Sequence, residues 1–146
     1  MSEAGVATRT VVVEKELAHA PEKVWRALTE GELIARWLMA NDFKPVVGHR
    51  FQLRTQPVGG WSGVIDCEVL EVVASQRLSY TWNTMGVDTV ATFTLTPTAE
   101  GTALRIEQSG FSEAQEQNYK GAMYGWRSFV GKLESVVNEM NEGETR

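Results

Sequence analysis

The sequence has little of the chemistry on which enzymes and metal sites depend. Among 146 residues there are one cysteine, Cys67, and two histidines, His19 and His49. A single cysteine cannot form an intrachain disulfide, which is typical of a protein from a reducing compartment. Neither histidine has an acidic residue at a spacing that indicates a catalytic pair, and no C-x-x-C or H-x-x-x-H pattern occurs. We therefore expect no catalytic residue, no metal and no cofactor.

Clustered basic charge and long hydrophobic runs are also missing. The 14 Lys and Arg residues are scattered among 19 Asp and Glu residues, and the formal net charge is −5. Nucleic-acid binding depends on clustered Lys and Arg, so we expect no nucleic-acid partner. No run approaches the ~18 apolar residues of a membrane span, and the first eight residues carry no secretory signal. The sequence predicts a cytoplasmic protein without a membrane span.

The length of the chain fits one domain. For 146 residues, folding removes roughly 68–70% of the unfolded chain's surface from water, which is enough for a hydrophobic core. We expect a single domain over residues 1–146 with an ordered core at about 8–140, because the tail at 141–146 is polar and terminal segments fray.

The end of the chain predicts one long amphipathic helix. Its apolar residues recur three and four positions apart, as on one face of an α-helix. Ser112 has the residue type of an N-cap, and Gln115 is three positions further on, as in a capping box. The apolar stripe consists of Met123, Trp126, Val130, Leu133, Val137 and Met140.

The rest of the chain is dominated by short segments with β-type alternation. Pro21 and Gly31 delimit two short helices, at 21–29 and 33–38, after the first strand. The alternation changes parity after Val69, which predicts a β-bulge near Val69 and Leu70. Strands are predicted at 8–18, 49–56, 63–73, 77–82, 87–97 and 102–109. This order predicts an α+β fold in which a curved antiparallel sheet wraps around the long C-terminal helix.

Four segments of the sequence resemble a known family. They read APEKVWRALTEGELIARW, GVIDCEVLEVVASQRLSYTW, TFTLTPTAEGTALRIEQSGF and GWRSFVGKLESVV. Together they resemble the START-like, helix-grip superfamily, also called SRPBCC, and more narrowly the family of the C-terminal domain of the activator of heat-shock protein 90 ATPase. The resemblance covers about residues 8–140 and implies the helix-grip fold. It leaves the function open, because the superfamily includes lipid carriers, aromatase/cyclases, stress proteins and co-chaperone domains.

The aromatic residues are the most informative candidates for a site. The chain has five Trp, five Phe and three Tyr, and several of them have the inward parity of their segments. They either fill the core or line a cavity with a few polar groups, as small-molecule sites do. Cys67, between Ile65 and Val69, is interpreted as a buried side chain and not as a reactive thiol. The candidate ligand-binding residues are Trp37, Phe51, Cys67, Tyr80, Trp82, Phe93, Gln108, Tyr119, Met123 and Trp126.

Two glycines inside the predicted long helix, Gly121 and Gly125, also need an explanation. Each costs ~1 kcal/mol of helix propensity relative to Ala. Close approach of a strand, room for a ligand, or a kink would account for them.

The sequence therefore favours the binding of a small hydrophobic or aromatic molecule between sheet and helix, by a monomer or weak homodimer. A first alternative, implied by the resemblance, is a chaperone-interacting domain that stimulates a partner's ATPase. The family's namesake also uses a separate N-terminal domain, for which 146 residues leave no room. A second alternative is a cyclase- or dehydratase-type enzyme with an acid or base in the cavity. The lack of a His–acid or paired-acid pattern is more consistent with a binding protein.

Overall fold

Seven strands form one antiparallel sheet in the computed structural model, which describes residues 8–140. The predicted polar tail at 141–146 lies outside the described residues. The order of the strands across the sheet is β1-β7-β6-β5-β4-β3-β2. The strands are β1 (Thr8–Leu17), β2 (Ala40–Asn41), β3 (Arg50–Arg54), β4 (Val64–Val73), β5 (Arg77–Thr84), β6 (Val87–Thr98) and β7 (Gly101–Ser112).

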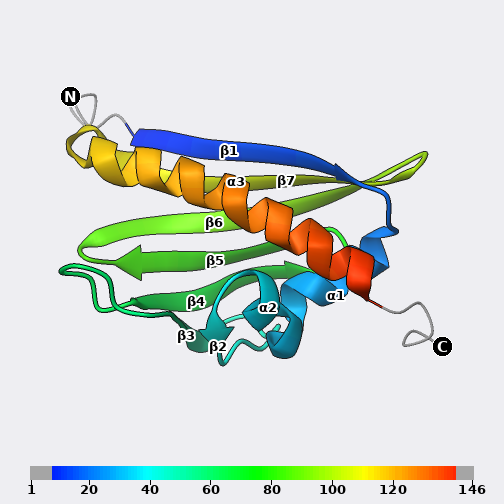
Figure 1. The fold of residues 1–146 in the computed structure, drawn as a ribbon, viewed down its shortest axis with the longest axis horizontal. Helices are drawn as coiled ribbons and strands as arrows, with labels where there is room; N and C mark the ends of the chain where they lie inside the picture. The colour runs from blue at the N-terminus through cyan, green and yellow to red at the C-terminus, as the bar shows by residue number, and fades with distance from the viewer. Residues whose placement is uncertain (1–7, 141–146) are drawn as a thin grey trace.

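One long helix, α3 (Glu116–Glu139), crosses one face of this sheet diagonally (Figure 1). It packs along β1 and β7 and, toward its C-terminal end, against α1 (Pro21–Thr29) and α2 (Gly31–Trp37). Salt bridges accompany both ends: Arg9 to Glu116 at 3.1 Å, and Arg36 to Glu139 at 2.7 Å. The helix-grip fold predicted from the sequence is confirmed.

The predicted apolar stripe is the buried face of α3. Trp126, Val130, Leu133 and Val137 are buried, and Met123 is partly buried. Met140 directly follows the last helical residue, and its N–H donates to Val136 O at 3.0 Å. At the other end a short 3₁₀ helix, η2 (Glu113–Gln115), precedes α3. The predicted capping contact is present there, because the Ser112 N–H donates to Gln115 Oε1 at 2.9 Å.

The two short helices occupy the predicted region with one difference. Gly31 is the first residue of α2 and not a separator outside it. The two helices are joined through Trp37, whose indole Nε1–H donates to Ala27 O at 2.8 Å. Strand β2, only two residues long, was not expected, because two residues are too few for a pattern of alternation.

Two β-bulges shape the sheet. The first shifts the register between Val69 and Glu71, so that Leu70 is the extra residue, as predicted. The second was not predicted: β7 continues to Ser112 instead of ending at Ser109, and Gly110 is the extra residue opposite β1. Gly110 has a φ of 109°, which an L side chain rarely adopts. The bulge reverses the parity of the strand, and Phe111 consequently points inward and is buried.

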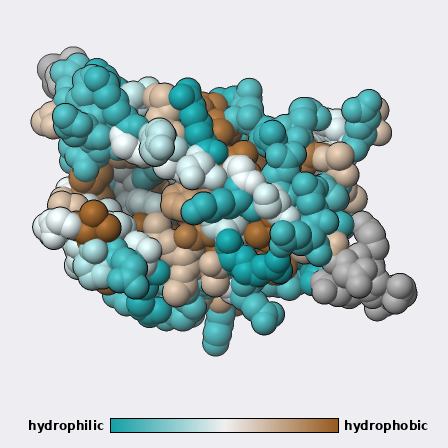
Figure 2. Space-filling model, viewed as in Figure 1, coloured by the Kyte–Doolittle hydropathy of each residue, from teal (hydrophilic) through white to brown (hydrophobic). Residues whose placement is uncertain are grey.

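The core between sheet and helices is rich in aromatic rings. The Phe93 ring lies at its centre, with ring centroids 5.6 Å from Tyr80, 5.7 Å from Trp126 and 6.4 Å from Trp37. The surface of the face that α3 covers is mostly hydrophilic, with hydrophobic side chains exposed in small groups (Figure 2). None of the described helices combines the length and hydropathy needed to cross a membrane.

Candidate ligand-binding cavity

A cavity of about 430 Å³ lies between the first half of α3 and the sheet. This volume is within the range of small-molecule sites. The sheet contributes Ile65, Trp82, Thr84, Val87, Gln108 and Phe111. The helix contributes Gln117, Asn118, Gly121, Ala122, Gly125, Trp126 and Phe129, and the connecting loops contribute Met39, Trp61 and Met85.

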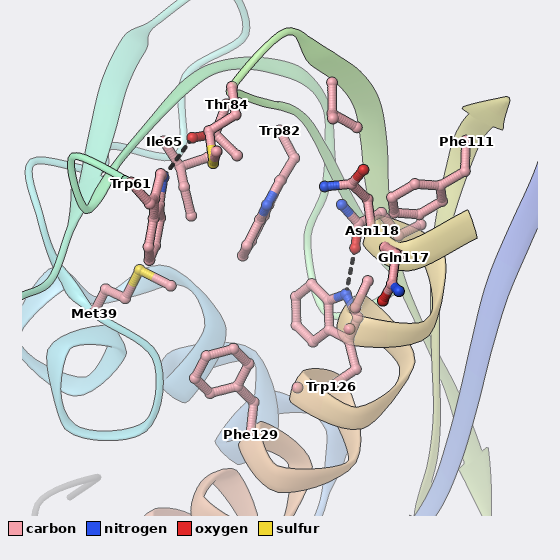
Figure 3. A pocket seen from close by; sticks show the side chains of 16 residues that line it. Met39, Trp61, Ile65, Trp82, Thr84, Phe111, Gln117, Asn118, Trp126 and Phe129 are labelled. Carbon is pink, nitrogen blue, oxygen red and sulfur yellow. Dashed lines mark hydrogen bonds between the residues drawn. The ribbon is translucent and has the colours of Figure 1, made fainter. Parts of the chain in front are cut away.

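Large apolar side chains surround the space. Trp61 and Met39 lie on one side and Trp126 and Phe129 on another, with Trp82 between them (Figure 3). The Trp126 ring centroid is 5.1 Å from that of Trp82 and 5.8 Å from that of Phe129. Trp126 also contacts Phe93, so it separates the cavity from the filled aromatic core.

The two helix glycines leave part of this space open. A Cβ atom built on Gly121 would meet no neighbouring atom within 4 Å, and one on Gly125 would meet only Phe129 Cε2, at 3.9 Å. The idea that a closely approaching strand requires these glycines is therefore wrong. Both line the cavity, which agrees with the alternative that they leave room for a ligand.

The lining carries no titratable side chain among the described residues. Its polar groups are Gln108 and Thr84 on the sheet and Gln117 and Asn118 on α3. Gln117 and Asn118 are exposed to solvent, whereas Gln108 is 3% exposed. The interior of the cavity is therefore apolar and uncharged, with one buried carboxamide.

A chain of buried hydrogen bonds joins α3 to three strands beside the cavity. The Trp126 Nε1–H donates to Gln108 Oε1 at 2.6 Å (Figure 3). Gln108 Nε2 donates to Thr89 Oγ1 at 2.8 Å, and the Thr89 hydroxyl donates to Trp82 O at 2.7 Å. Buried polar groups that satisfy one another in this way fix the position of the elements that carry them. The network holds the Trp126 ring against the sheet.

A second, shorter series of hydrogen bonds fixes the wall of the cavity opposite Trp126. The Trp61 Nε1–H donates to Thr84 Oγ1 at 2.7 Å, and the Thr84 hydroxyl donates to Val64 O at 2.8 Å. Trp61 is in the β3–β4 connection, where Val58 and Trp61 form an isolated bridge. The indole N–H groups of both Trp61 and Trp126 are thus occupied within the protein.

Three of the ten residues predicted for the site line the cavity: Trp82, Gln108 and Trp126. The other seven do not. Four of them, Trp37, Phe51, Tyr80 and Phe93, are buried in the aromatic core. Cys67, on β4, is buried and pairs with Phe51 on β3. Met123 packs against the hydrophobic core. Tyr119 is partly buried, with its ring centroid 6.0 Å from that of Phe111 and 5.1 Å from the Arg9 guanidinium.

Burial keeps two titratable side chains of the core, those of Cys67 and Tyr80, neutral. It raises the pKa of the Cys67 thiol to about 12, with a smaller contribution from the negative charges of Asp66 and Asp42. Burial likewise raises the pKa of Tyr80 well above its usual value. Since neither residue lines the cavity, neither presents an ionised group to a ligand.

Several lining residues were missed from the sequence for identifiable reasons. Trp61 follows Gly59-Gly60 in the connection between the strands predicted at 49–56 and 63–73, and no pattern in the sequence assigned it a role. Phe111 was placed in a connection because the Gly110 bulge was not anticipated. Met39 and Met85 are in a connection and at a hairpin tip, where no periodicity indicates which way a side chain points.

A curved antiparallel sheet that holds a C-terminal helix over an apolar cavity defines the START-like class of helix-grip proteins. Within this class, the chain belongs to the Activator of Hsp90 ATPase homolog 1-like protein family, whose model matches residues 18–138.

Solved structures agree with this assignment. Protein MLL2253 from Mesorhizobium loti is 52% identical, covering 91% of this chain and 99% of that chain, with a TM-score of 0.84. Protein BH1534 from Bacillus halodurans is 28% identical, covering 91% and 99%, with a TM-score of 0.77. Protein CV1439 from Chromobacterium violaceum is 25% identical, covering 90% and 99%, with a TM-score of 0.71. No curated protein matches the sequence.

Proposed function

We propose that the protein binds a small, uncharged, predominantly aromatic or apolar molecule in the cavity between α3 and the sheet. The observation that carries this proposal is the cavity of about 430 Å³ with an aromatic lining. Burial of apolar ligand surface against such a lining provides a binding free energy of roughly 25 cal/mol per Å² before the costs of association.

The absence of charge from the lining limits the ligand class. A charged group loses its hydration on entering an apolar cavity, and without a partner of opposite charge this loss is not offset. The described residues that line the cavity offer no such partner. A neutral ligand is therefore favoured over an organic anion or cation.

The same observation favours binding over proton-transfer catalysis. A cyclase or dehydratase of the acid–base type needs a titratable group within hydrogen-bond reach of its substrate. The described lining offers Gln, Asn and Thr side chains instead. A chaperone contact, suggested by the description of the family, stays a prediction, and the cavity gives it no support.

A neutral fluorescent probe tests the proposal directly. N-phenyl-1-naphthylamine should bind saturably, quench tryptophan emission through Trp82 and Trp126, and raise the melting temperature. A free probe concentration of ~100 Kd stabilises the native state by about 2.7 kcal/mol, which corresponds to several degrees in Tm. Fluorescence titration and thermal melts measure both effects.

Two matched variants locate the binding site. Ala122 lines the cavity, whereas Ser128 is an exposed residue of the same helix that does not. Ala122→Leu should fill the space and weaken probe binding at least about tenfold, because no room is left beside the rings. Ser128→Leu adds a similar apolar surface elsewhere and should leave the affinity unchanged. Absence of saturable binding, or equal affinities of the two variants, would contradict the proposal.

A further inference from the structure

The Gln108 carboxamide is a buried polar side chain of the described cavity lining that retains an unused donor. Gln108 is 3% exposed, pairs with Ala91 on β6 and Val11 on β1, and lines the cavity. Its surroundings are the aromatic rings described above. What this carboxamide can donate or accept determines which polar group a ligand can bring into the cavity.

The orientation of the carboxamide is fixed by its partners. The indole N–H of Trp126 can only donate, so the atom that faces it, at 2.6 Å, must be the oxygen. The nitrogen then faces Thr89 Oγ1 at 2.8 Å, and the Thr89 hydroxyl is free to accept because its own hydrogen is donated to Trp82 O. A flipped carboxamide would place two donors against each other at Trp126.

One N–H of this carboxamide is left over. The side-chain nitrogen of glutamine carries two hydrogens, and the hydrogen bonds of the described residues use only one of them. A buried donor without an acceptor is unfavourable, more so than a carbonyl with one unused lone pair. Any molecule that displaces water from Gln108 must therefore supply an acceptor in its place.

Most other donors of the inner wall are occupied, and the exception is the indole N–H of Trp82, for which the described residues provide no hydrogen-bond partner (Figure 3). The Trp61 and Trp126 indole N–H groups donate to Thr84 and Gln108, and the Thr84 hydroxyl donates to Val64 O. The acceptor that reaches Gln108 must be neutral, because the described lining holds no cation to pair with a carboxylate or phosphate.

We propose that the ligand carries a neutral carbonyl-type acceptor on an aromatic or apolar body, and that this acceptor receives a hydrogen bond from Gln108 Nε2. This inference rests on the proposed function, since it names the chemical class of the molecule in the cavity. Gln108 then discriminates among neutral ligands of similar size, because a hydrocarbon of the same shape leaves its N–H without a partner.

Three two-ring probes of similar size test the inference. They are 2-acetylnaphthalene, which offers a neutral carbonyl, 2-isopropylnaphthalene, which offers no acceptor, and 2-naphthoate, which offers a charged one. The measured quantity is the ratio of the dissociation constants of hydrocarbon and ketone, determined by calorimetry or tryptophan quenching. In the native protein the ratio should exceed that of Gln108→Met about three- to tenfold, the effect of one hydrogen bond.

A control variant and a spectroscopic readout accompany this comparison. Gln76→Met replaces an exposed carboxamide that does not line the cavity by the same side chain and should leave the ratio as in the native protein. If Gln108→Met does not fold, the side-chain amide resonances of ¹⁵N-glutamine-labelled native protein decide the matter. One Gln108 proton should shift downfield with the ketone and not with the hydrocarbon.

The outcomes separate this inference from the proposed function. Suppose that ketone and hydrocarbon both bind, that the ratio of their dissociation constants is the same in the native protein and in Gln108→Met, and that the Gln108 amide proton shifts equally with both. The inference then fails and the binding function stands. If 2-naphthoate binds more tightly than the ketone, the neutral class is wrong. If neither neutral probe binds and N-phenyl-1-naphthylamine does not bind either, the inference and the proposed function are both overturned.

Discussion

At the scale of single residues, three glycines shape the cavity. Gly110 permits the bulge in β7, because its positive φ and its closeness to Asp88 O and Thr89 leave no place for a Cβ. The bulge turns Phe111 toward the cavity. Gly110 thus adds a side chain to the cavity wall. Gly121 and Gly125 instead leave the helix face that covers the cavity without side chains at these two positions. Their cost in helix propensity is offset by no packing contact in the described structure.

Gly125→Ala is therefore expected to improve stability and to weaken ligand binding. Because the new methyl meets only Phe129 Cε2, at 3.9 Å, the gain in helix propensity of up to ~1 kcal/mol should be realised. The same methyl occupies part of the cavity, so probe affinity should fall. Urea denaturation and probe titration measure the two effects.

Gly131→Ala is the matched control. Gly131 is also in α3 with no atom within 4 Å of a built Cβ, but it does not line the cavity. This variant should gain similar stability and keep the native affinity. A destabilised Gly125→Ala protein with unchanged affinity would show that the cavity does not extend to this residue.

At the scale of elements, α3 has two halves with different roles. The C-terminal half buries Val130, Leu133 and Val137 against the sheet and the two short helices. The N-terminal half carries Gly121 and Gly125 and covers the cavity. Between the two halves Trp126 is held by Gln108. The first half can therefore border an open space because the second half anchors the helix.

Leu133→Ala tests the anchoring half. Leu133 is fully buried, so its truncation should lower the free energy of unfolding by about 2–5 kcal/mol. Lys132→Ala, one position earlier, removes an exposed side chain whose ammonium is 5.9 Å from the Phe129 ring centroid and should cost under ~1 kcal/mol. Chemical denaturation of both variants measures the difference. Equal losses would contradict the helical phase described here.

At the scale of the whole molecule, charge and cavity are kept apart. The chain has a formal net charge of −5, but most ion pairs of the described residues join exposed side chains that do not line the cavity. Such pairs contribute little to stability individually. The cavity interior contains none of these groups among the described residues. Long-range fields from the surface act weakly on a neutral ligand.

Affinity for a neutral probe should consequently be independent of pH and salt. The raised pKa of Cys67, about 12, and the raised pKa of Tyr80 keep both groups protonated from pH 6 to 9. The pKa of Asp42 is lowered, chiefly by the Gln52 N–H that donates to its carboxylate, so Asp42 stays ionised over the same range. The dissociation constant should change less than about twofold between pH 6 and 9 and between low and high salt. An inflection in this range would show that a titrating group acts on the cavity.

Much of the architecture could be predicted from the sequence because it follows from local periodicity. The alternation of the strands, the parity change at Leu70 and the stripe through Trp126 and Leu133 each depend on residues close in sequence. The resemblance seen in the sequence agrees with the match to the family model and with the similar solved structures. Strand β2 and the end of β7 were missed, because a two-residue strand and a glycine bulge leave no periodic pattern.

The sequence by itself determined the longer elements, their order, their buried faces and the lack of clustered charge, since each depends on residue type and short spacing. Only the tertiary structure decided which inward aromatic residues fill the core and which border the cavity. Phe93 and Trp82 have the same inward parity on neighbouring strands, yet Phe93 is enclosed by three rings while Trp82 faces open space. The physical reason is that the cavity lies where α3, the connecting loops and the bulged strand β7 do not pack against one another. That depends on their relative positions in space, which periodicity does not encode.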